Sequence, residues 1–224
     1  MKKLAVTIAI LTFCPAASFA DNMAVSAKVG SLGFGVELTK AIADNVTGRA
    51  GLNAFDYNKN ISKSTVNYDM GLQLQTVTAI ADWYPSRGIF RTSAGLFYNN
   101  NKASLNAWPA TGSYIINNVT YAAADVGSMQ GSMAFNSLAP YLGIGWGNPV
   151  AKGVDGGWGF VADIGVMYQG TPRVTLTGTC SAALTIVQCA ALKSDISGEQ
   201  IKLQSALNDF TWYPVVSIGV SYRW

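Results

Sequence analysis

Few side chains in this sequence could carry out acid–base or metal chemistry. The 224 residues contain no histidine, which excludes a histidine general base, a Ser-His-Asp triad and a histidine-ligated metal site. No grouping of Ser, Asp and Glu resembles a catalytic constellation. We therefore predict a protein that is not an enzyme and that holds no cofactor or metal.

Seven charged residues stand out because each occurs in a segment where apolar and small residues alternate. Only 12% of the residues are charged, so an isolated charge in such a segment needs a partner or a function. The charges can pair with one another in a water-poor interior, or they can form the charged constriction of a selective polar path. The seven are Glu37, Arg49, Asp69, Asp82, Arg91, Asp163 and Arg223.

The first twenty residues have the composition of an export signal. A basic start is followed by an apolar stretch, 4–13, that is too short to span a bilayer. Ser18 and Ala20 place small residues at the −3 and −1 positions of a cleavage site. Residues 1–20 are therefore predicted to be a signal peptide, and residues 21–224 a single mature domain.

Export also bears on the cysteines. Cys14 lies within the signal segment, and the preceding Phe13 does not fit a lipoprotein cleavage site, which normally carries a small residue there. Cys14 is therefore expected to leave with the signal. Cys180 and Cys189 remain, and an even pair in an exported chain predicts one disulfide.

The mature chain is close to neutral. Loss of the two signal lysines leaves 13 basic against 12 acidic residues, and no basic run follows. Nucleic acid is therefore not an expected partner.

Apolar residues alternate with small or polar ones in several long segments, which indicates β-strands. The clearest segment is the C-terminus, where an apolar residue occupies every second position, and segments 156–169 and 88–99 repeat this pattern. That C-terminal face contains Trp212, Pro214, Val216, Ile218, Val220, Tyr222 and Trp224. The mature chain has no run of 18 apolar residues, so no transmembrane helix is expected.

The alternation fits an all-β transmembrane barrel better than a soluble β-sandwich. Its apolar faces carry almost no Lys or Glu, and aromatic residues gather at both ends of the strands. Such a lipid-facing surface, with small and polar residues inside, is typical of outer-membrane barrels. The last alternate positions are similar to the signal that these barrels present to their assembly machinery: Val216, Ile218, Val220, Tyr222 and Trp224.

An eight-stranded antiparallel barrel is expected. The phase of the alternation flips after Gly30, which indicates either a bulge or a turn, and the even strand number usual in such barrels favours a turn. Both termini would then be periplasmic, and the longer loops 102–128 and 180–210 external. The predicted strands are 24–30, 33–40, 45–57, 65–84, 88–101, 129–147, 156–179 and 211–224.

The external loops have structural signals of their own. Loop 102–128 is rather apolar, which predicts an extra hairpin or a fold over the barrel mouth, acting either as a cap or as a binding surface. In loop 180–210 an apolar series has roughly helical spacing: Leu192, Ile196, Leu203 and Leu207. It predicts a short external helix docked on the barrel rim, with a partner-binding helix as the alternative. Three lysines are expected at the solvated rim, or as binding residues for anionic lipid headgroups or an acidic ligand: Lys59, Lys63 and Lys102.

Three segments of the C-terminal half resemble the CarO-type outer-membrane proteins, a family associated with carbapenem susceptibility. The segments are 139–145 (APYLGIG), 165–177 (GVMYQGTPRVTLT) and 210–220 (FTWYPVVSIGV). The resemblance implies an outer-membrane barrel of a Gram-negative bacterium and a route for basic amino acids such as ornithine.

The predicted function is a porin-like narrow route for small solutes, basic ones among them. The alternative is a closed barrel with a structural role, or with a role as an adhesin or receptor through its loops. An eight-stranded barrel is only wide enough for side chains to fill it, which favours pairing of the seven charges but leaves a narrow path open. The expected partners are outer-membrane lipid, the barrel assembly machinery during insertion, and small solutes.

Overall fold

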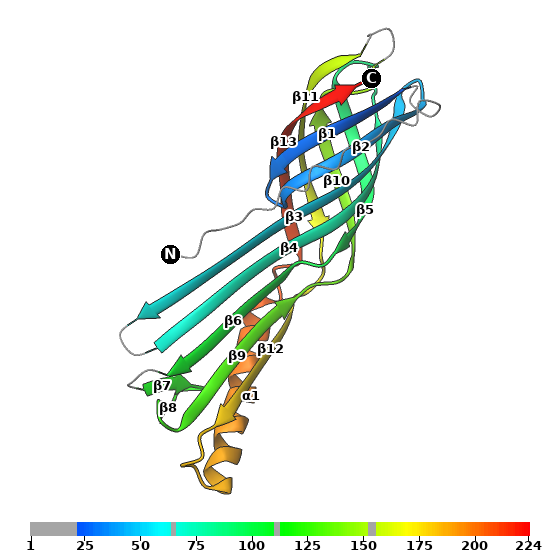
Figure 1. Cartoon of the computed structure of the whole chain (residues 1–224). Coiled ribbons are helices and arrows are strands. Elements are labelled where there is room, and N and C mark those ends of the chain that lie inside the picture. Colours follow the sequence, from blue (N-terminus) through cyan, green and yellow to red (C-terminus); the bar gives the residue numbers. More distant parts are fainter. Residues whose placement is uncertain (1–21, 64–65, 110–112, 152–155) are drawn as a thin grey trace.

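The structure is a computed structural model that describes residues 22–63, 66–109, 113–151 and 156–224. The predicted signal peptide, 1–20, lies outside the described residues. Figure 1 shows a barrel at one end of the molecule and a curved sheet with one helix at the other. The elements in chain order are β1 (Met23–Gly30), β2 (Gly33–Ala43), β3 (Val46–Lys63), β4 (Val66–Trp83), β5 (Phe90–Asn99), β6 (Lys102–Pro109), β7 (Ser113–Ile116), β8 (Val119–Ala122), β9 (Val126–Ala134), β10 (Leu138–Trp146), β11 (Gly157–Tyr168), β12 (Arg173–Cys180), α1 (Ile186–Leu207) and β13 (Trp212–Arg223).

Eight antiparallel strands close into a barrel, which confirms the predicted fold. Their order around the barrel is β1, β2, β3, β4, β5, β10, β11 and β13, and β13 pairs with β1 to close it. β1 and β2 are separate strands because Gly30 pairs with Gly33 across a tight turn. Gly33 has a φ of 93° there, a value that residues with a Cβ atom rarely adopt. The phase flip after Gly30 is therefore a turn.

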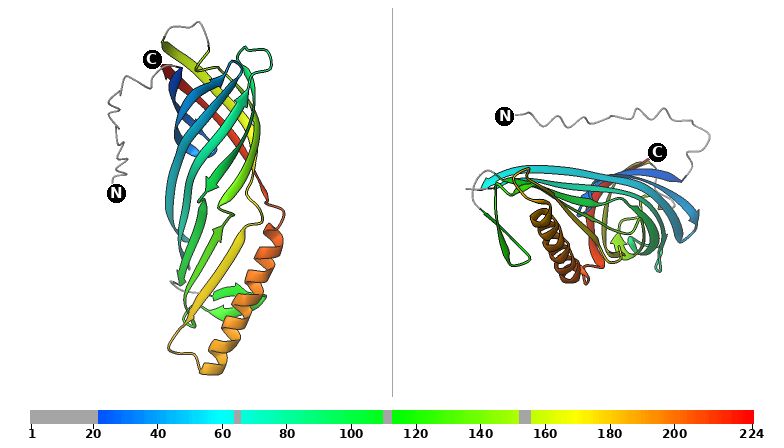
Figure 2. Two further views of the ribbon diagram at one scale, coloured as in Figure 1. Left: turned by 90° about the vertical axis from the view of Figure 1, so that its right-hand side faces the viewer. Right: turned by 90° about the horizontal axis from the view of Figure 1, so that it is seen from below.

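Strands β3 and β4 continue well beyond the barrel. Each has 18 residues, more than the roughly 9–11 that a tilted strand needs to cross a membrane. β4 changes partner along its length, pairing with β5 over 76–83 and with β6 over 66–73. β9 pairs with β6, and β12 with β9. We call the resulting curved sheet, together with α1 and the β7–β8 hairpin, the extension; Figure 2 shows the sheet curving around one side of α1.

Several predicted segments divide at the level where the extension leaves the barrel. The predicted strand 129–147 consists of β9 and β10, and the predicted strand 156–179 consists of β11 and β12. Segment 102–128, predicted as a loop, instead holds β6, the β7–β8 hairpin and the start of β9, so the extra hairpin expected there is present. Alternating residues occur on both sides of each break, and the alternation does not specify which strand lies alongside.

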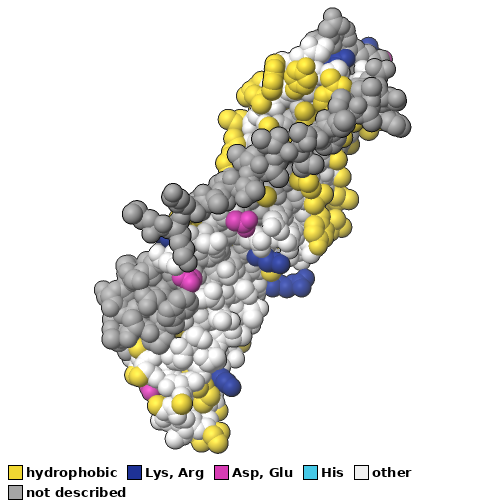
Figure 3. Space-filling view, viewed as in Figure 1, with side chains coloured by type: hydrophobic (Ala, Val, Ile, Leu, Met, Phe, Trp, Pro, Cys, Tyr) yellow, Lys and Arg dark blue, Asp and Glu magenta, His cyan; other side chains and the backbone are white. Residues whose placement is uncertain are grey.

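The hydrophobic face of β4 changes side between the barrel and the extension. The outward face is apolar along the barrel and polar beyond it, running from Trp83, Ala81, Ala79 and Val77 to Gln75 and Gln73. The opposite face shows the reverse change, from Asp82, Thr78 and Thr76 to Leu74, Leu72 and Met70. Figure 3 accordingly shows hydrophobic side chains concentrated over the barrel, and a mostly polar outer face on the extension. The barrel surface therefore suits lipid, whereas the outer face of the extension suits water.

Helix α1 covers the free edge of β12. The Gln200 side-chain oxygen accepts a hydrogen bond from the backbone N–H of Leu176 at 3.0 Å, and that of Gln204 accepts one from Val174, also at 3.0 Å. Four helical residues advance about 6 Å and two strand residues about 6.6 Å, so the two repeats match. The helix thereby supplies acceptors for an edge that would otherwise present unpaired N–H groups.

The position of α1 differs from the expected dock on the barrel rim. The helix has 22 residues, starts with a capping box at Thr185, and packs on β12 and the β7–β8 hairpin. Leu192 and Ile196 are buried in the cluster it forms with the hairpin. Gly198 lets the hairpin turn lie close to the helix, because a Cβ atom at this position would be only 2.9 Å from Nδ2 of Asn117. Among the described residues, no helix is both long and apolar enough to cross a membrane.

Candidate functional site

The barrel interior holds a cluster of six charged side chains, three basic and three acidic. Each comes from the inward face of a different barrel strand, and all are largely shielded from solvent. Because the numbers of positive and negative charges are equal, the cluster is neutral overall. We call it the ionic layer; its members are Lys28, Glu37, Arg49, Asp82, Arg91 and Asp163.

Arg49 is the centre of the ionic layer. Its Nε lies 2.6 Å from Oδ2 of Asp82, and its Nη2 donates to Oδ1 of the same carboxylate at 2.8 Å. Its Nη1 donates to Glu37 at 3.1 Å and to Asp163 at 3.2 Å. A planar guanidinium with five donors can serve three carboxylates in this way, which a lysine could not do with the same geometry.

A second ion pair depends on a missing side chain. Arg91 donates from Nη2 to Oδ1 of Asp163 at 2.7 Å. A Cβ atom on Gly145 of β10 would lie 2.7 Å from that carboxylate oxygen and 2.8 Å from Nε of Arg91. The glycine on the inward face therefore provides the space that the ion pair fills.

An apolar layer lies against the ionic layer inside the barrel. Phe97 and Tyr141 stack with ring centroids 4.7 Å apart, in a buried cluster with Leu32, Ile80, Met167 and Val215. The cavity lined by residues of both layers has a volume of about 30 Å³, room for only one or two water molecules.

Five of the seven predicted charges belong to the ionic layer, and two lie elsewhere. Asp69 lies on the part of β4 that belongs to the extension, where it pairs with Asn60 and Asn106. It occupies the strand face opposite to that of Asp82, because the two positions differ by an odd number in sequence. Arg223 lies at the end of the barrel where β1 begins and β13 ends, and it donates to the carbonyl of Ala151.

Lys28 is a member of the ionic layer that was not among the predicted residues. Its Nζ lies 2.7 Å from Glu37 and 3.4 Å from Asp163. The signal was present in the alternation, because Lys28 shares its phase with Ser26 while Val25, Ala27 and Val29 occupy the other face.

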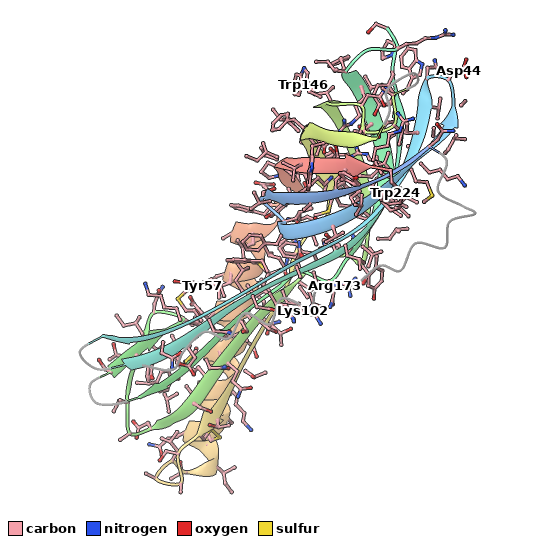
Figure 4. The ribbon with its side chains drawn as sticks, turned by 45° about the horizontal axis from the view of Figure 1, so that its top comes forward. Asp44, Tyr57, Lys102, Trp146, Arg173 and Trp224 are labelled. Atoms are coloured by element: carbon pink, nitrogen blue, oxygen red, sulfur yellow. A yellow bond between two sulfur atoms is a disulfide. The ribbon has the colours of Figure 1, made fainter. Side chains whose placement is uncertain are left out.

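The remaining predicted residues lie on the outside of the barrel or in the extension. The predicted disulfide Cys180–Cys189 is present and joins the end of β12 to the first turn of α1. Val216, Ile218, Val220, Tyr222 and Trp224 all face outward from β13 and are exposed. Figure 4 shows Lys102 beside Arg173, and both residues pair with Ala134 across the sheet. The side chain of Lys63 lies outside the described part of the chain.

The β7–β8 hairpin docks on α1 through a carboxylate. The Tyr121 hydroxyl donates to Oδ2 of Asp195, and Nδ2 of Asn117 donates to Oδ1 at 3.0 Å. These two hydrogen bonds lower the pKa of Asp195, and the bond to Asp195 raises the pKa of Tyr121 to about 12.

The inner face of the extension forms an elongated apolar groove with two chambers. The outer chamber, about 610 Å³, lies between the sheet and the second half of α1, and its lining includes Tyr57, Lys59 and Leu203. The inner chamber, about 260 Å³, lies towards the barrel, with Phe210 and Tyr213 in its lining. Both chambers are lined by Leu72, Ala103, Met133 and Leu207, so they are continuous. We call the two together the groove.

The groove is open to solvent despite its apolar lining. Met70 is 47% exposed, and Leu72 and Leu105 are each 39% exposed. A surface of this kind in a folded protein commonly marks an interaction or ligand site.

Two solved structures of Acinetobacter baumannii proteins are similar to this chain along most of its length. The crystal structure of CarO matches with a TM-score of 0.56 and 27% sequence identity, covering 90% of this chain and 97% of that chain. The chain is a CarO-like outer-membrane β-barrel. The crystal structure of CarO2 matches with a TM-score of 0.56 and 24% identity, covering 90% and 98% of the two chains.

These similarities confirm the predicted family resemblance and its fold. No family model and no curated protein matches the chain. A CarO-like barrel indicates the outer membrane of a Gram-negative bacterium, and hence a lipid environment around the exposed apolar faces of the barrel strands.

Proposed function

We propose that this protein is a closed outer-membrane barrel that works as a receptor or adhesin at the cell surface, with the extension as its binding part. The observation that carries the proposal is the filling of the barrel by the ionic and apolar layers, with a cavity of about 30 Å³ between them. Each carboxylate of the ionic layer already has a cation within 3.2 Å. A passing basic solute would have to displace a buried guanidinium, which is costly. The porin-like route for small basic solutes is therefore the alternative.

The orientation belongs to the proposal. We infer that both termini are periplasmic and that the extension is extracellular. Short turns support this orientation, since only residues 44–45 join β2 to β3 at the end of the barrel that holds the termini. The long connections leave from the other end, as is usual for the outer face of such barrels. The exposed alternate residues of β13 would then engage the assembly machinery from the periplasm.

Solute flux tests the proposal directly. Liposomes containing the refolded protein are placed in lysine, arginine or an uncharged sugar of similar size, and swelling is recorded together with single-channel current. We expect swelling no faster than in protein-free liposomes and no current. Faster entry of lysine or arginine than of the sugar would overturn the proposal in favour of the porin-like route.

A variant shows that the assay can detect an opening. Glu37→Ser with Arg49→Ser removes one acid and one base together, so the barrel charge is unchanged while the centre of the ionic layer is emptied. We expect this variant to conduct where the wild type does not. Thr39→Ser, a small change at a buried inward position outside the ionic layer, is the matched control and should remain closed.

A further inference from the structure

The inner chamber of the groove contains two buried amide side chains that are each half satisfied. Oδ1 of Asn101 accepts a hydrogen bond from the backbone N–H of Gln75 at 2.9 Å, and Nε2 of Gln169 donates to the carbonyl of Phe210 at 3.1 Å. Their other polar atoms, Nδ2 of Asn101 and Oε1 of Gln169, have no hydrogen-bond partner within the described part of the chain. Both residues are only about 3% exposed and both line the chamber.

One free donor and one free acceptor in an otherwise apolar chamber specify a polar group. Unpaired buried polar atoms cost free energy, so native structures usually supply them with a partner. The partner here must accept from Asn101 and donate to Gln169. A carboxylic acid in its protonated form does both, because its carbonyl oxygen accepts and its hydroxyl donates.

The rest of the groove specifies what the polar group is attached to. From the inner chamber the groove continues, past Leu72 and Met133, into the larger apolar outer chamber. Among the described residues, neither chamber is lined by an aspartate or a glutamate, which disfavours a cationic amphiphile.

We propose that the groove binds a long-chain fatty acid that it captures from the surrounding medium. Its carboxyl group lies in the inner chamber between Asn101 and Gln169, and its hydrocarbon chain lies along the outer chamber beneath α1. This inference rests on the proposed role of the extension as the binding part of the molecule, and it names the ligand of that role.

Binding is measured on the intact protein in phospholipid nanodiscs. Palmitic acid labelled with carbon-13 at its carboxyl group is titrated in, and protein-free nanodiscs report partition into lipid. We expect saturable binding of one molecule per barrel, with a carboxyl resonance distinct from that of the lipid-dissolved acid. Absence of saturable binding would overturn the proposal. Retention of a phospholipid that palmitic acid does not displace would overturn it as well, because the occupant would then come from the membrane.

A matched pair of variants places the ligand in the groove. Met133→Trp fills the passage between the two chambers, whereas Gln130→Trp puts the same side chain on the opposite, exposed face of β9. We expect Met133→Trp to weaken binding at least about tenfold, or 1.4 kcal/mol, and Gln130→Trp to leave it unchanged. Equal losses in the two variants would contradict the assigned site.

The head group is tested by changing the ligand rather than the protein. The methyl ester of palmitic acid keeps the chain and the acceptor but lacks the donor for Gln169. We expect it to bind roughly tenfold more weakly than the acid, and Gln169→Met to weaken the acid but not the ester. Equal binding of acid and ester would overturn the head-group assignment. Flux and binding are separate measurements, so a leaky barrel that binds palmitic acid and a closed barrel that does not are distinguishable results.

Discussion

At the scale of single residues, the ionic layer depends on matched partners rather than on any one strong contact. Arg49 alone reaches all three carboxylates, and Asp163 receives donors from both Arg49 and Arg91. Buried ion pairs add little stability compared with well-packed apolar residues, but loss of one partner leaves an uncompensated charge. We therefore expect substitution of one charged residue of the ionic layer to destabilise the fold more than substitution of both members of an ion pair.

Asp163→Asn tests this asymmetry. The change leaves Arg91 without its closest carboxylate, so we expect the free energy of unfolding to fall by about 3–5 kcal/mol. Adding Arg91→Met should recover part of that loss, because the second change removes the stranded charge. Denaturant unfolding of the refolded barrel, followed by tryptophan fluorescence, measures both effects. Strictly additive losses would contradict the pairing.

Tyr121 and Asp195 give the extension a measurable pH response. The pKa of Tyr121 is raised to about 12 by its hydrogen bond to Asp195, so its contribution to hairpin docking is complete below pH 10 and is lost as the pH rises through about 12. The pKa of Asp195 is lowered, so its contribution is present above its usual value of about 3.9 and is lost as the pH falls through the lowered value. We expect Asp195→Asn to return the phenol pKa towards 10. The wild type and Asp195→Asn are each titrated by ultraviolet absorbance beside the same protein carrying Tyr121→Phe, and the difference between the two curves isolates the Tyr121 phenol. An unchanged phenol pKa in Asp195→Asn would show that the hydrogen bond from Tyr121 to Asp195 is not made.

At the scale of elements, α1 stabilises an edge that would otherwise be open. β12 is the last strand of the sheet, and its outward N–H groups meet Gln200 and Gln204 at matching intervals. Gln204 also donates to the carbonyl of Pro172 at 2.8 Å. The disulfide holds the opposite end of the same helix to the same strand. The helix is therefore fixed to β12 at both ends, which keeps one wall of the groove in place.

Replacing both glutamines tests the edge contacts. In Gln200→Leu with Gln204→Leu, the amides of Val174 and Leu176 lose their acceptors, and we expect each loss to cost about 1 kcal/mol. Hydrogen exchange at these two amides should become faster, while exchange in the barrel strands should stay unchanged. Ser205→Leu, on an exposed position of the same helix, is the control. Unaltered exchange at both amides would mean that the edge is protected by something other than α1.

At the scale of the whole molecule, two surfaces of opposite character share the same strands. Aromatic pairs mark the ends of the apolar surface of the barrel: Trp158 and Tyr222 at the end with the termini, and Tyr168 and Trp212 at the other. Beyond the second pair the outward face becomes polar and the inner face apolar, as on β4. Lipid can therefore surround the barrel while the groove remains outside the hydrocarbon region.

Deletion of Trp224 tests how the whole barrel reaches its membrane. Trp224 is the last outward aromatic residue, and it follows Tyr222 on the exposed face of β13. If these residues form the assembly signal, the deletion should lower the amount of folded barrel in the outer membrane several-fold. Heat-modifiable migration on a gel measures the folded fraction. Trp212→Ala, at the other end of the same strand, should leave the yield closer to normal, and a normal yield after deletion of Trp224 would argue against the signal.

The alternation of residues predicted the barrel and five members of the ionic layer, and together with the even strand number usual in such barrels it predicted eight strands. This worked because side chains on a strand repeat every two residues, so a lipid-facing surface leaves its period in the sequence. The same period would have revealed Lys28, which lies in phase with Ser26, and would have separated Asp69 from Asp82, which lie on opposite faces of β4.

Only the tertiary structure decided where the strands change partners and what they enclose. β4 pairs with β5 in the barrel and with β6 beyond it, and nothing in its local alternation records which neighbour lies alongside. The contacts of Gln200 with Leu176 and of Gln204 with Val174 span 24 and 30 residues of chain, so no helical or strand period predicts them. The free amide groups of Asn101 and Gln169 share one chamber because the breaks after β5 and β11 occur at the same level of the barrel. Periodicity specifies which face a residue occupies, whereas a cavity depends on which faces from distant segments meet.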